Sequence, residues 1–437
     1  MSKIEASEGG AAVSRANGKA ERGPGEATMR LGIFRRRPMR GVSKYQFALL
    51  FLFALLPSCA SYTSATKQGF EAFEHRDFGS AESVYDKGAN EDGKDQLVYV
   101  FDRGTVRYTA GLYEMSIKDF LLADKLSEIK DYTAIGTEAA SILVNDQILQ
   151  YKGEEFEHVI VSVYLALNFA ALGKDEEAAV AARQVNRKLE RLRDEGGRKY
   201  HLNAFAQYLA GLLFERQRNW NFAYVDYKKT LQLAPNFSRV KIDLLRGALW
   251  SDSSSDLHKW KRTLGLTAED VKDASREMKQ TGGVVLLYQT GFAPEKVPNA
   301  TWHELPDYRR RFNKHRAARL YLDGEEVART EILYDVEQAA IENMNQKYAG
   351  YIAKRVAGVV ARETIGHKLD QEKPGLGTIF KIAMYAASQA DLRSWSTLPK
   401  DFQVARVQVK PGKYKASVRL EDIYGTLSEE GIWGTYG

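Results

Sequence analysis

The stretch that decides the fold of the first half of the chain runs from Ala204 to Pro235 and reads AFAQYLAGLLFERQRNWNFAYVDYKKTLQLAP. Its apolar residues recur at helical spacing on both sides of a short polar break, which predicts two helices. Each predicted helix carries a small residue and an aromatic one, Gly211 with Phe214 and Ala223 with Tyr227. Two antiparallel helices pack closely when small residues lie at their crossing and large residues fill the space beside it. The stretch therefore predicts a tightly packed helix pair.

These residues resemble a tetratricopeptide repeat (TPR), a unit of two helices that recurs about every 34 residues. The resemblance places Gly211 and Ala223 where the two helices cross, Phe214 and Tyr227 beside the crossing, and Pro235 at the end of the repeat. A single degenerate repeat would be weak evidence for an array. An array would require further copies in the region before it.

Three weaker copies precede this repeat, beginning near Tyr62, Leu97 and Val159. They carry small and aromatic residues at matching places: Gly69, Ala81 and Tyr85 in the first, Gly104, Gly111, Phe120 and Ala123 in the second, and Leu165, Ala166, Phe169, Gly173, Ala178 and Ala182 in the third. The starts are unevenly spaced, so the array contains insertions. The sequence thus predicts a TPR-like helical array, and an irregular helical bundle is the alternative.

After residue 280 short apolar runs alternate with turn residues, which is typical of strands. Two pairs of runs predict β-hairpins: Ala318–Leu322 with Glu325–Ala328 across Asp323-Gly324, and Val404–Val409 with Tyr414–Leu420 across Pro411-Gly412. Helical stretches are expected at about 336–365 and 379–390. The predicted fold class is α+β, in which an N-terminal all-α TPR-like array is followed by a smaller α+β domain with an antiparallel sheet.

The net charge of +6 belongs entirely to the beginning of the chain. Residues 1–58 hold ten Lys and Arg against four Asp and Glu, and the remaining residues hold 53 of each sign. A neutral mature part gives no electrostatic reason to expect a nucleic-acid partner.

The only cysteine, Cys59, follows an apolar run at 47–56 that is preceded by a basic stretch. Ten helical residues reach about 15 Å, half of a bilayer core, which indicates the apolar core of a signal peptide and not a spanning helix. Leu56-Pro57-Ser58-Cys59 resembles a lipobox, the site where a lipoprotein is cut and acylated. We therefore expect palmitate-type acyl chains on Cys59. A general secretory signal with a chance cysteine is the alternative.

The expected domains are a leader and signal peptide at 1–58, the TPR-like helical domain at 59–250, a linker at 251–280 and the α+β domain at 281–437. This layout resembles a family of poorly characterised bacterial TPR lipoproteins that share a D-x-R-S-W-x-T-L-P segment before a closing hairpin. The residues that match the segment are Asp391, Arg393, Ser394, Trp395, Thr397, Leu398 and Pro399. The resemblance implies a role in an envelope assembly and brings no established activity.

Four residues on the inner face of the array, Phe101, Tyr108, Tyr208 and Arg216, form the predicted peptide- or protein-binding groove. Aromatic and Arg side chains dominate the energetics of protein interfaces, so this face would suit an extended or helical peptide. In the alternative, the C-terminal domain folds back and covers the face, because exposed apolar surface needs a partner or a cover.

The residues Asp391, Arg393 and Trp395 of the C-terminal segment have two interpretations. Asp391, Arg393 and Trp395 could form a polar site, or an Arg–carboxylate pair beneath an aromatic ring that locks the fold. The locking role is the one we expect.

The predicted function is that of an outer-membrane-anchored lipoprotein, on the periplasmic side, that binds another envelope protein or peptide as an adaptor. Ala60 after the cysteine lacks the Asp that signals inner-membrane retention in enterobacteria. We expect no enzyme activity, no catalytic residue, no cofactor and no metal, because the sequence shows no zinc-binding His pair, phosphate-binding loop or dinucleotide fingerprint. An envelope enzyme that acts on glycan or peptidoglycan through the C-terminal domain is the alternative, and it would require paired carboxylates in an open cleft.

Overall fold

The computed structural model describes residues 62–132, 149–196, 203–251 and 254–436. Residues 60–437 form one unit by their internal contacts. Cys59, the predicted lipidation site, lies outside the described residues. No helix in the described part of the chain combines the length and apolar character needed to cross a bilayer.

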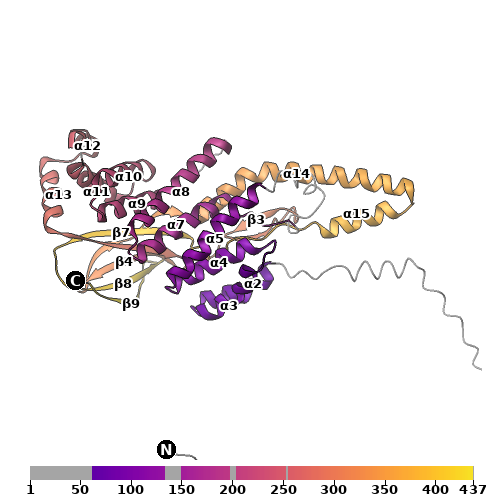
Figure 1. The fold of residues 1–437 in the computed structure, drawn as a ribbon, viewed down its shortest axis with the longest axis horizontal. Helices are drawn as coiled ribbons and strands as arrows, with labels where there is room; N and C mark the ends of the chain where they lie inside the picture. Colours follow the sequence, from indigo (N-terminus) through magenta and orange to yellow (C-terminus); the bar gives the residue numbers. More distant parts are fainter. Residues whose placement is uncertain (1–61, 133–148, 197–202, 252–253, 437) are drawn as a thin grey trace, which may run out of the picture. The chain divides into compact units, whose positions relative to one another are not determined.

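Helix follows helix through the first half of the described chain, as the repeat pattern predicts (Figure 1). The successive helices are α2 (Tyr62–Glu74), α3 (Phe78–Asn90), α4 (Gln96–Thr109), α5 (Tyr113–Tyr132), α7 (Glu155–Ala171), α8 (Asp175–Gly196), α9 (Ala204–Arg216), α10 (Trp220–Leu233) and α11 (Ser238–Trp250). Each packs against the next in sequence. This helical array confirms the first half of the predicted fold class.

The pair α9–α10 shows why the small residues matter. Asn203 and Asn219 cap the two helices by accepting hydrogen bonds from backbone N–H groups of their first turns. Gly211 lies on α9 against the ring of Tyr227, and a Cβ there would be 2.6 Å from a ring carbon. Ala223 is fully buried on α10. The two helices therefore approach closely at Gly211, where the repeat pattern places the crossing.

Replacing Gly211 by Leu is expected to lower the free energy of unfolding by about 1–3 kcal/mol or more, because the added side chain overpacks the crossing. Gly350→Leu is the matched control, since a Cβ at this helical glycine of α14 (Val336–Glu372) meets nothing within 4 Å. The two variants are compared by thermal and urea unfolding. Equal midpoints would contradict the assigned helix crossing.

The second half begins with short helices and continues with strands. The expected linker holds a 3₁₀ turn, η3 (Ser254–Asp256), and the helices α12 (Leu257–Leu264) and α13 (Ala268–Gln280). The strands are β1 (Gly282–Thr290), β2 (Glu295–Pro298), β3 (Pro306–Arg309), β4 (His315–Leu322), β5 (Glu325–Arg329), β6 (Glu331–Asp335), β7 (Asp401–Val409), β8 (Tyr414–Asp422) and β9 (Leu427–Tyr436). Between β6 and β7 lie α14 and α15 (Leu376–Ala387).

These strands form antiparallel sheets, which confirms the second half of the predicted fold class. Sheet A has the order β1-β7-β6, sheet B is the pair β2-β3, and sheet C has the order β5-β4-β8-β9. Several of these pairings join strands that are far apart in the sequence, since β7 pairs with β1 and β6, and β8 pairs with β4.

The first predicted hairpin is confirmed and the second is wrong. β4 pairs with β5 across Asp323 and Gly324, which both have positive φ angles, as a two-residue turn of this type requires. β7 and β8 do not pair with each other. Both edges of β7 are occupied by β1 and β6, so the chain passes after Val409 from sheet A into sheet C, where β8 begins at Tyr414.

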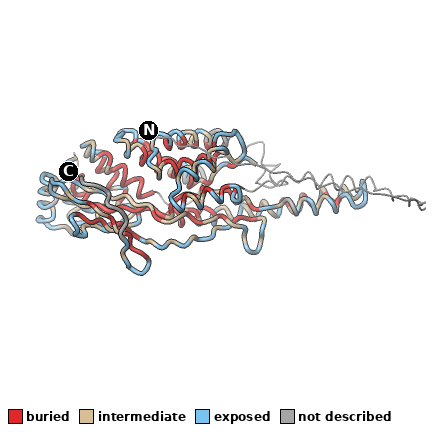
Figure 2. Tube along the Cα trace, turned by 90° about the horizontal axis from the view of Figure 1, so that it is seen from below, coloured by how far each residue is buried: buried red, intermediate tan, exposed pale blue. Residues whose placement is uncertain are grey.

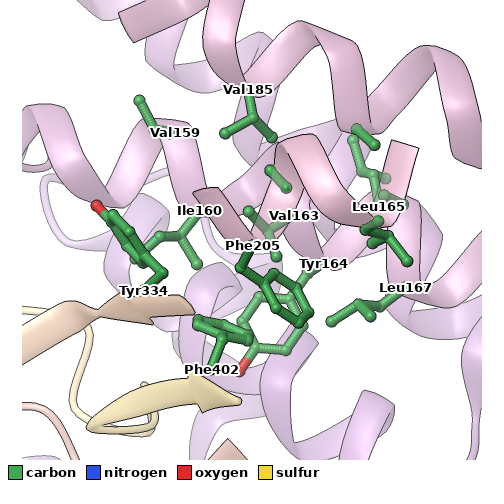
Figure 3. Packing of buried hydrophobic residues seen from close by; sticks show 14 of the residues in the cluster. Val159, Ile160, Val163, Tyr164, Leu165, Leu167, Val185, Phe205, Tyr334 and Phe402 are labelled. Carbon is green, nitrogen blue, oxygen red and sulfur yellow. The ribbon is translucent and has the colours of Figure 1, made fainter. Parts of the chain in front are cut away.

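Sheet A lies between the helical array and sheet C. On one face, Phe402 and Val404 of β7 belong to the core that the helices build, and Figure 3 shows Phe402 beside Phe205 of α9. On the other face, side chains of β1 and β7 that include Val407 pack against sheet C. Because strand side chains alternate between faces, one strand contributes to both layers. The buried residues follow these layers through the array and the sheets (Figure 2).

Candidate functional site

The segment Asp391–Pro399, hereafter the docking segment, lies against the helical array without forming a helix or strand itself. Its central residue, Trp395, is 2% exposed. The Trp395 ring stacks on Phe101 of α4, with ring centroids 4.5 Å apart and planes 10° from parallel. Its indole N–H donates to the Thr105 hydroxyl at 2.8 Å, and its backbone N–H donates to a carboxylate oxygen of Glu157 at 2.7 Å. A residue of the second half thus occupies the inner face of the helices.

Asp102 holds the next residues of the docking segment. One oxygen of its buried carboxylate accepts hydrogen bonds from the Thr397 backbone N–H at 2.8 Å, the Thr397 hydroxyl at 2.7 Å and the Ser396 hydroxyl at 3.1 Å. The Tyr62 hydroxyl donates to the other oxygen. Burial raises the pKa of Asp102 to about 6, although these hydrogen bonds lower it. The carboxylate acts here as a fixed acceptor for a loop backbone.

Glu157, on α7, also accepts a hydrogen bond from the backbone of the docking segment. Besides the Trp395 backbone N–H, it accepts hydrogen bonds from the Tyr151 hydroxyl at 2.6 Å and the Glu154 backbone N–H at 2.7 Å. Burial, and then the neighbouring Glu154 charge, raise the pKa of Glu157 to about 7. Both carboxylates therefore lie inside the fold and accept hydrogen bonds from other groups of the chain.

Arg393 forms the Arg–carboxylate pair that the sequence predicts. Its guanidinium donates to both oxygens of Asp391 at 2.8 and 2.7 Å, to Asp95 at 2.7 Å and to the Leu149 carbonyl at 2.9 Å. The pair with Asp391 was expected from the sequence, and the bonds to Asp95 and Leu149 tie it to the helical array. The geometry supports the locking interpretation of Asp391, Arg393 and Trp395.

Two buried ion clusters strengthen the same junction, and sequence reasoning missed both as links between the halves. Lys296 of β2 and Lys347 of α14 place their ammonium groups 2.7 and 2.9 Å from the two oxygens of Glu154. Burial raises the pKa of Glu154, but the charges of the two lysines hold it well below its usual range. Lys296 is 142 residues away from its partner in sequence, so no local pattern could have indicated the pair.

The second cluster joins β7 to the array. The Arg406 guanidinium lies 2.9 Å from a Glu215 oxygen and 3.0 Å from an Asp243 oxygen. Arg246 pairs with Glu215 at 3.1 Å from the helical side. The buried Arg406 thereby fastens sheet A to α9 and α11.

The predicted open groove at Phe101, Tyr108, Tyr208 and Arg216 is corrected by these contacts. Phe101 and Tyr208 are fully buried, and Phe101 is covered by Trp395. The Tyr108 hydroxyl accepts a hydrogen bond from Gln289 of β1 at 3.1 Å. Arg216 is half exposed and pairs with Asp175 on α8. The inner face of the array is filled by the second half of the same chain, which is the alternative that the sequence left open.

An exposed apolar surface remains on the hairpin of α14 and α15, which extends away from the sheets and the array in Figure 1. Val356 and Val360 of α14 are 54% and 61% exposed, and Ile379 and Ile382 of α15 are 45% and 65% exposed. These four residues define the hairpin surface. Their spacing of four and three residues puts each pair on one side of its helix. The four side chains are exposed large apolar groups on one helical hairpin.

The hairpin surface is exposed because small and polar residues fill the space between the two helices. A Cβ on Gly377 would meet the Gly366 carbonyl oxygen at 1.8 Å, so the backbones touch there. The Asp370 carboxylate accepts a hydrogen bond from the Gly377 backbone N–H at 2.8 Å and stabilises the turn. Arg362, buried between the helices, donates to Ser388 near the end of α15. Close approach through glycines leaves the valines and isoleucines directed outward.

The described residues contain no group of three or more His, Cys, Asp or Glu side chains placed to hold a metal ion. Asp102 and Glu157 are two of the acidic residues whose pKa burial raises, and both are covered by the docking segment. The paired carboxylates in an open cleft that a glycan hydrolase requires are not formed by these two residues.

Comparison with known proteins finds a helical-repeat likeness only. No protein-family model matches the chain, and no curated protein matches it. Among solved structures, the chain is similar to the MamA protein (13% identity, TM-score 0.31, 50% of this chain and 93% of that one). It is also similar to a tetratricopeptide repeat protein from Parabacteroides merdae (15% identity, TM-score 0.31, 50% and 73%). A third is the Rap conjugation gene regulator of the plasmid pLS20 in complex with the Phr* peptide (12% identity, TM-score 0.28, 81% and 80%). Scores at this level carry no information on function.

Proposed function

We propose that this protein is a lipid-anchored adaptor on the periplasmic side of the outer membrane, and that it binds another envelope protein through the hairpin surface. The observation that carries the proposal is the exposure of Val356, Val360, Ile379 and Ile382 on a helical hairpin that leaves the rest of the unit. Exposed large apolar side chains that gather on one helical hairpin are typical of a protein-binding surface.

The inner face of the array is already occupied, so the proposed binding site is the hairpin. A repeat array commonly binds its partners on the inner face, but here Trp395 and Thr397 of the docking segment are hydrogen-bonded to Thr105 and Asp102 on that face. A partner would have to displace a stacked ring and several buried hydrogen bonds. The hairpin surface requires no such displacement, and helix faces with apolar residues three and four positions apart suit a helix or groove of another protein.

The proposed lipid on Cys59 would determine where the protein lies in the cell envelope. The folded part begins at Tyr62, three residues after Cys59, so a lipid on that cysteine would hold the array within about 10 Å of the membrane surface. Several acyl chains on one residue anchor a protein effectively permanently. The Cys59 lipobox, the run of apolar residues before it and Ala60 after it support an outer-membrane lipoprotein.

The test is photo-crosslinking in cells with a photoreactive amino acid at Val356. Val180 on α8 is the matched control, because it is a valine with the same exposed fraction of 54%. We expect one discrete adduct from Val356 and none from Val180. In the Cys59→Ser variant, we expect no palmitate labelling and no protein in the membrane fraction. The Val356 adduct is expected to be absent as well. Equal adducts from Val356 and Val180, or none from Val356 in the anchored protein, would contradict the adaptor proposal.

A further inference from the structure

Two neighbouring turns carry the most exposed large apolar side chains among the residues that the structure describes. Phe312, between β3 and β4, is 81% exposed, and Tyr424, between β8 and β9, is 85% exposed. The Ile423 backbone N–H donates to the Lys314 carbonyl at 3.0 Å, which joins the two turns. Phe312, Ile423 and Tyr424 are hereafter called the aromatic tip.

The aromatic tip is held in place by the turns that carry it. The Asp422 carboxylate accepts hydrogen bonds from the Tyr424 and Thr426 backbone N–H groups at 2.9 and 2.8 Å. In the other turn, the Asn313 side chain donates to the Thr290 hydroxyl at 3.2 Å. The two exposed rings therefore project from turns that hydrogen bonds fix to the fold.

The aromatic tip adjoins the first described helix. The Arg311 guanidinium, next to Phe312 in sequence, lies 4.4 Å from the ring centre of Phe70 on α2. Phe70 comes eight residues after Tyr62, the first residue of α2, which is about 12 Å along the helix axis. The tip is thus attached to the helix that follows Cys59, the proposed lipid site.

The charge exposed around the aromatic tip is positive. The stretch 309–316 holds five basic residues and no acidic one. Lys314, whose backbone joins the two turns, is exposed. Three arginines of the stretch pair with glutamates, and in each pair the basic side chain is the more exposed member: 67% against 31% for Arg309 and Glu295, 65% against 3% for Arg310 and Glu337, and 51% against 0% for Arg316 and Glu421.

A bilayer fits the aromatic tip better than a folded protein does. An aromatic side chain buries about 150–250 Å², so the two rings together offer about 300–500 Å², less than the about 800 Å² per partner of a standard protein interface. Insertion into a bilayer requires only the side chains themselves. Aromatic side chains are enriched at the level of the lipid headgroups, and basic residues are attracted to anionic headgroups.

We propose that the aromatic tip inserts into the headgroup region of a membrane that contains anionic phospholipids, and that the basic residues beside it bind the headgroups. Together with a lipid on Cys59, this second contact fixes the orientation of the unit on the membrane surface. The inference rests on the proposed function for a location at the membrane, but the contact itself needs no acyl chain.

The experiment uses the full chain with Cys59→Ser, which removes the only cysteine and with it any acyl chain. The further change Phe312→Cys provides a single site for the environment-sensitive fluorophore NBD. Vesicles of phosphatidylcholine alone are compared with vesicles that also contain phosphatidylglycerol. We expect the NBD emission to increase and shift to the blue with the anionic vesicles. Val180→Cys on α8, where the native side chain is 54% exposed, is the labelled control and should show no change.

The apolar residues 47–56 are present in both labelled chains, so a difference between them reports the aromatic tip. The unlabelled double variant Phe312→Ser, Tyr424→Ser should weaken cosedimentation with anionic vesicles about tenfold or more. Phe222→Ser, at a side chain that is 46% exposed on α10, is its control and should bind as the parent chain does.

The proposal is overturned if the label at position 312 does not respond to anionic vesicles, if the label at position 180 responds equally, or if the double variant cosediments as the parent chain does. A response at position 312 that needs no vesicles and grows with protein concentration would also overturn it, because the tip would then join two copies of the chain. None of these results affects the Val356 adduct, which tests the adaptor proposal separately.

Discussion

Replacing Trp395 by Ala lowers the free energy of unfolding by about 3–5 kcal/mol, the range for removing a large aromatic side chain from a core. The Trp395 ring is stacked on Phe101 and lies 5.5 and 5.6 Å from the rings of Phe120 and Tyr164. Truncation leaves a cavity between the array and the docking segment, and it removes the donor that the Thr105 hydroxyl accepts from. Urea unfolding measures the change.

Trp250→Ala is the control, because Trp250 is 45% exposed at the end of α11. Its removal is expected to change stability much less, since little of its surface is buried. If the two variants unfold at the same urea concentration, Trp395 is not the centre of the junction, and the description of the docking segment is wrong.

Glu154→Gln is expected to cost about 3–5 kcal/mol, because it leaves the Lys296 ammonium buried without an opposite charge. Only 4% of the Lys296 side chain is exposed. Glu155→Gln, one residue along the same helix, is the control, since 25% of the Glu155 side chain is exposed and its contact to Lys347 is at 4.0 Å. The double variant Glu154→Gln, Lys296→Met should recover part of the loss, because the Lys296 ammonium is then absent, whereas Lys347 keeps only its contact to Glu155 at 4.0 Å.

The Glu154 pair also predicts a pH dependence. The pKa of Glu154 is held low in the folded protein, so its contribution to stability is present above the pKa of an unfolded glutamate, about 4.3, and is lost as the pH falls toward the folded value. The stability difference between wild type and Glu154→Gln should therefore shrink as the pH falls below about 4. A difference that grows at low pH would contradict the ion pair.

The helical half of the fold could be predicted from the sequence because its determinants are local. Small residues such as Gly211 face the second helix of the same repeat unit, where Tyr227 lies only 16 positions later, so a short stretch of sequence contains the packing information. The predicted starts at Tyr62 and Ala204 coincide with the first residues of α2 and α9. The starts near Leu97 and Val159 lie within a turn of the first residues of α4 and α7.

The sheet half could be predicted only where its pairing is local. Asp323 and Gly324 specify a tight turn by their own conformations, and the hairpin β4–β5 follows. The turn at Pro411-Gly412 was interpreted in the same way, but β7 pairs with β1, which lies more than a hundred residues earlier. Partners at such a distance leave no trace in the turn itself, so the second hairpin prediction failed.

In the candidate site, too, contacts between residues close in sequence could be predicted and contacts between distant residues could not. The pair of Asp391 with Arg393 lies within three residues and was expected, whereas the acceptors Asp102 and Glu157 lie on helices of the first half. The sequence analysis placed Phe101 correctly on the aromatic inner face. It did not identify Trp395 as the residue that covers Phe101, because Trp395 is 294 positions away. Many aromatic residues on one face of a repeat array indicate that another segment or a partner covers that face. The sequence alone does not identify the covering segment.

Amide hydrogen exchange of Trp395 and Thr397 tests the central claim, that the inner face of the array is occupied by the chain's own docking segment. Both backbone N–H groups donate to buried carboxylates, to Glu157 at 2.7 Å and to Asp102 at 2.8 Å. We predict that they exchange as slowly as the amide of Tyr164 in the middle of α7, through global unfolding only. Exchange of Trp395 and Thr397 at the rate of an unstructured peptide, with Tyr164 still protected, would show that the segment leaves the groove and would contradict the account.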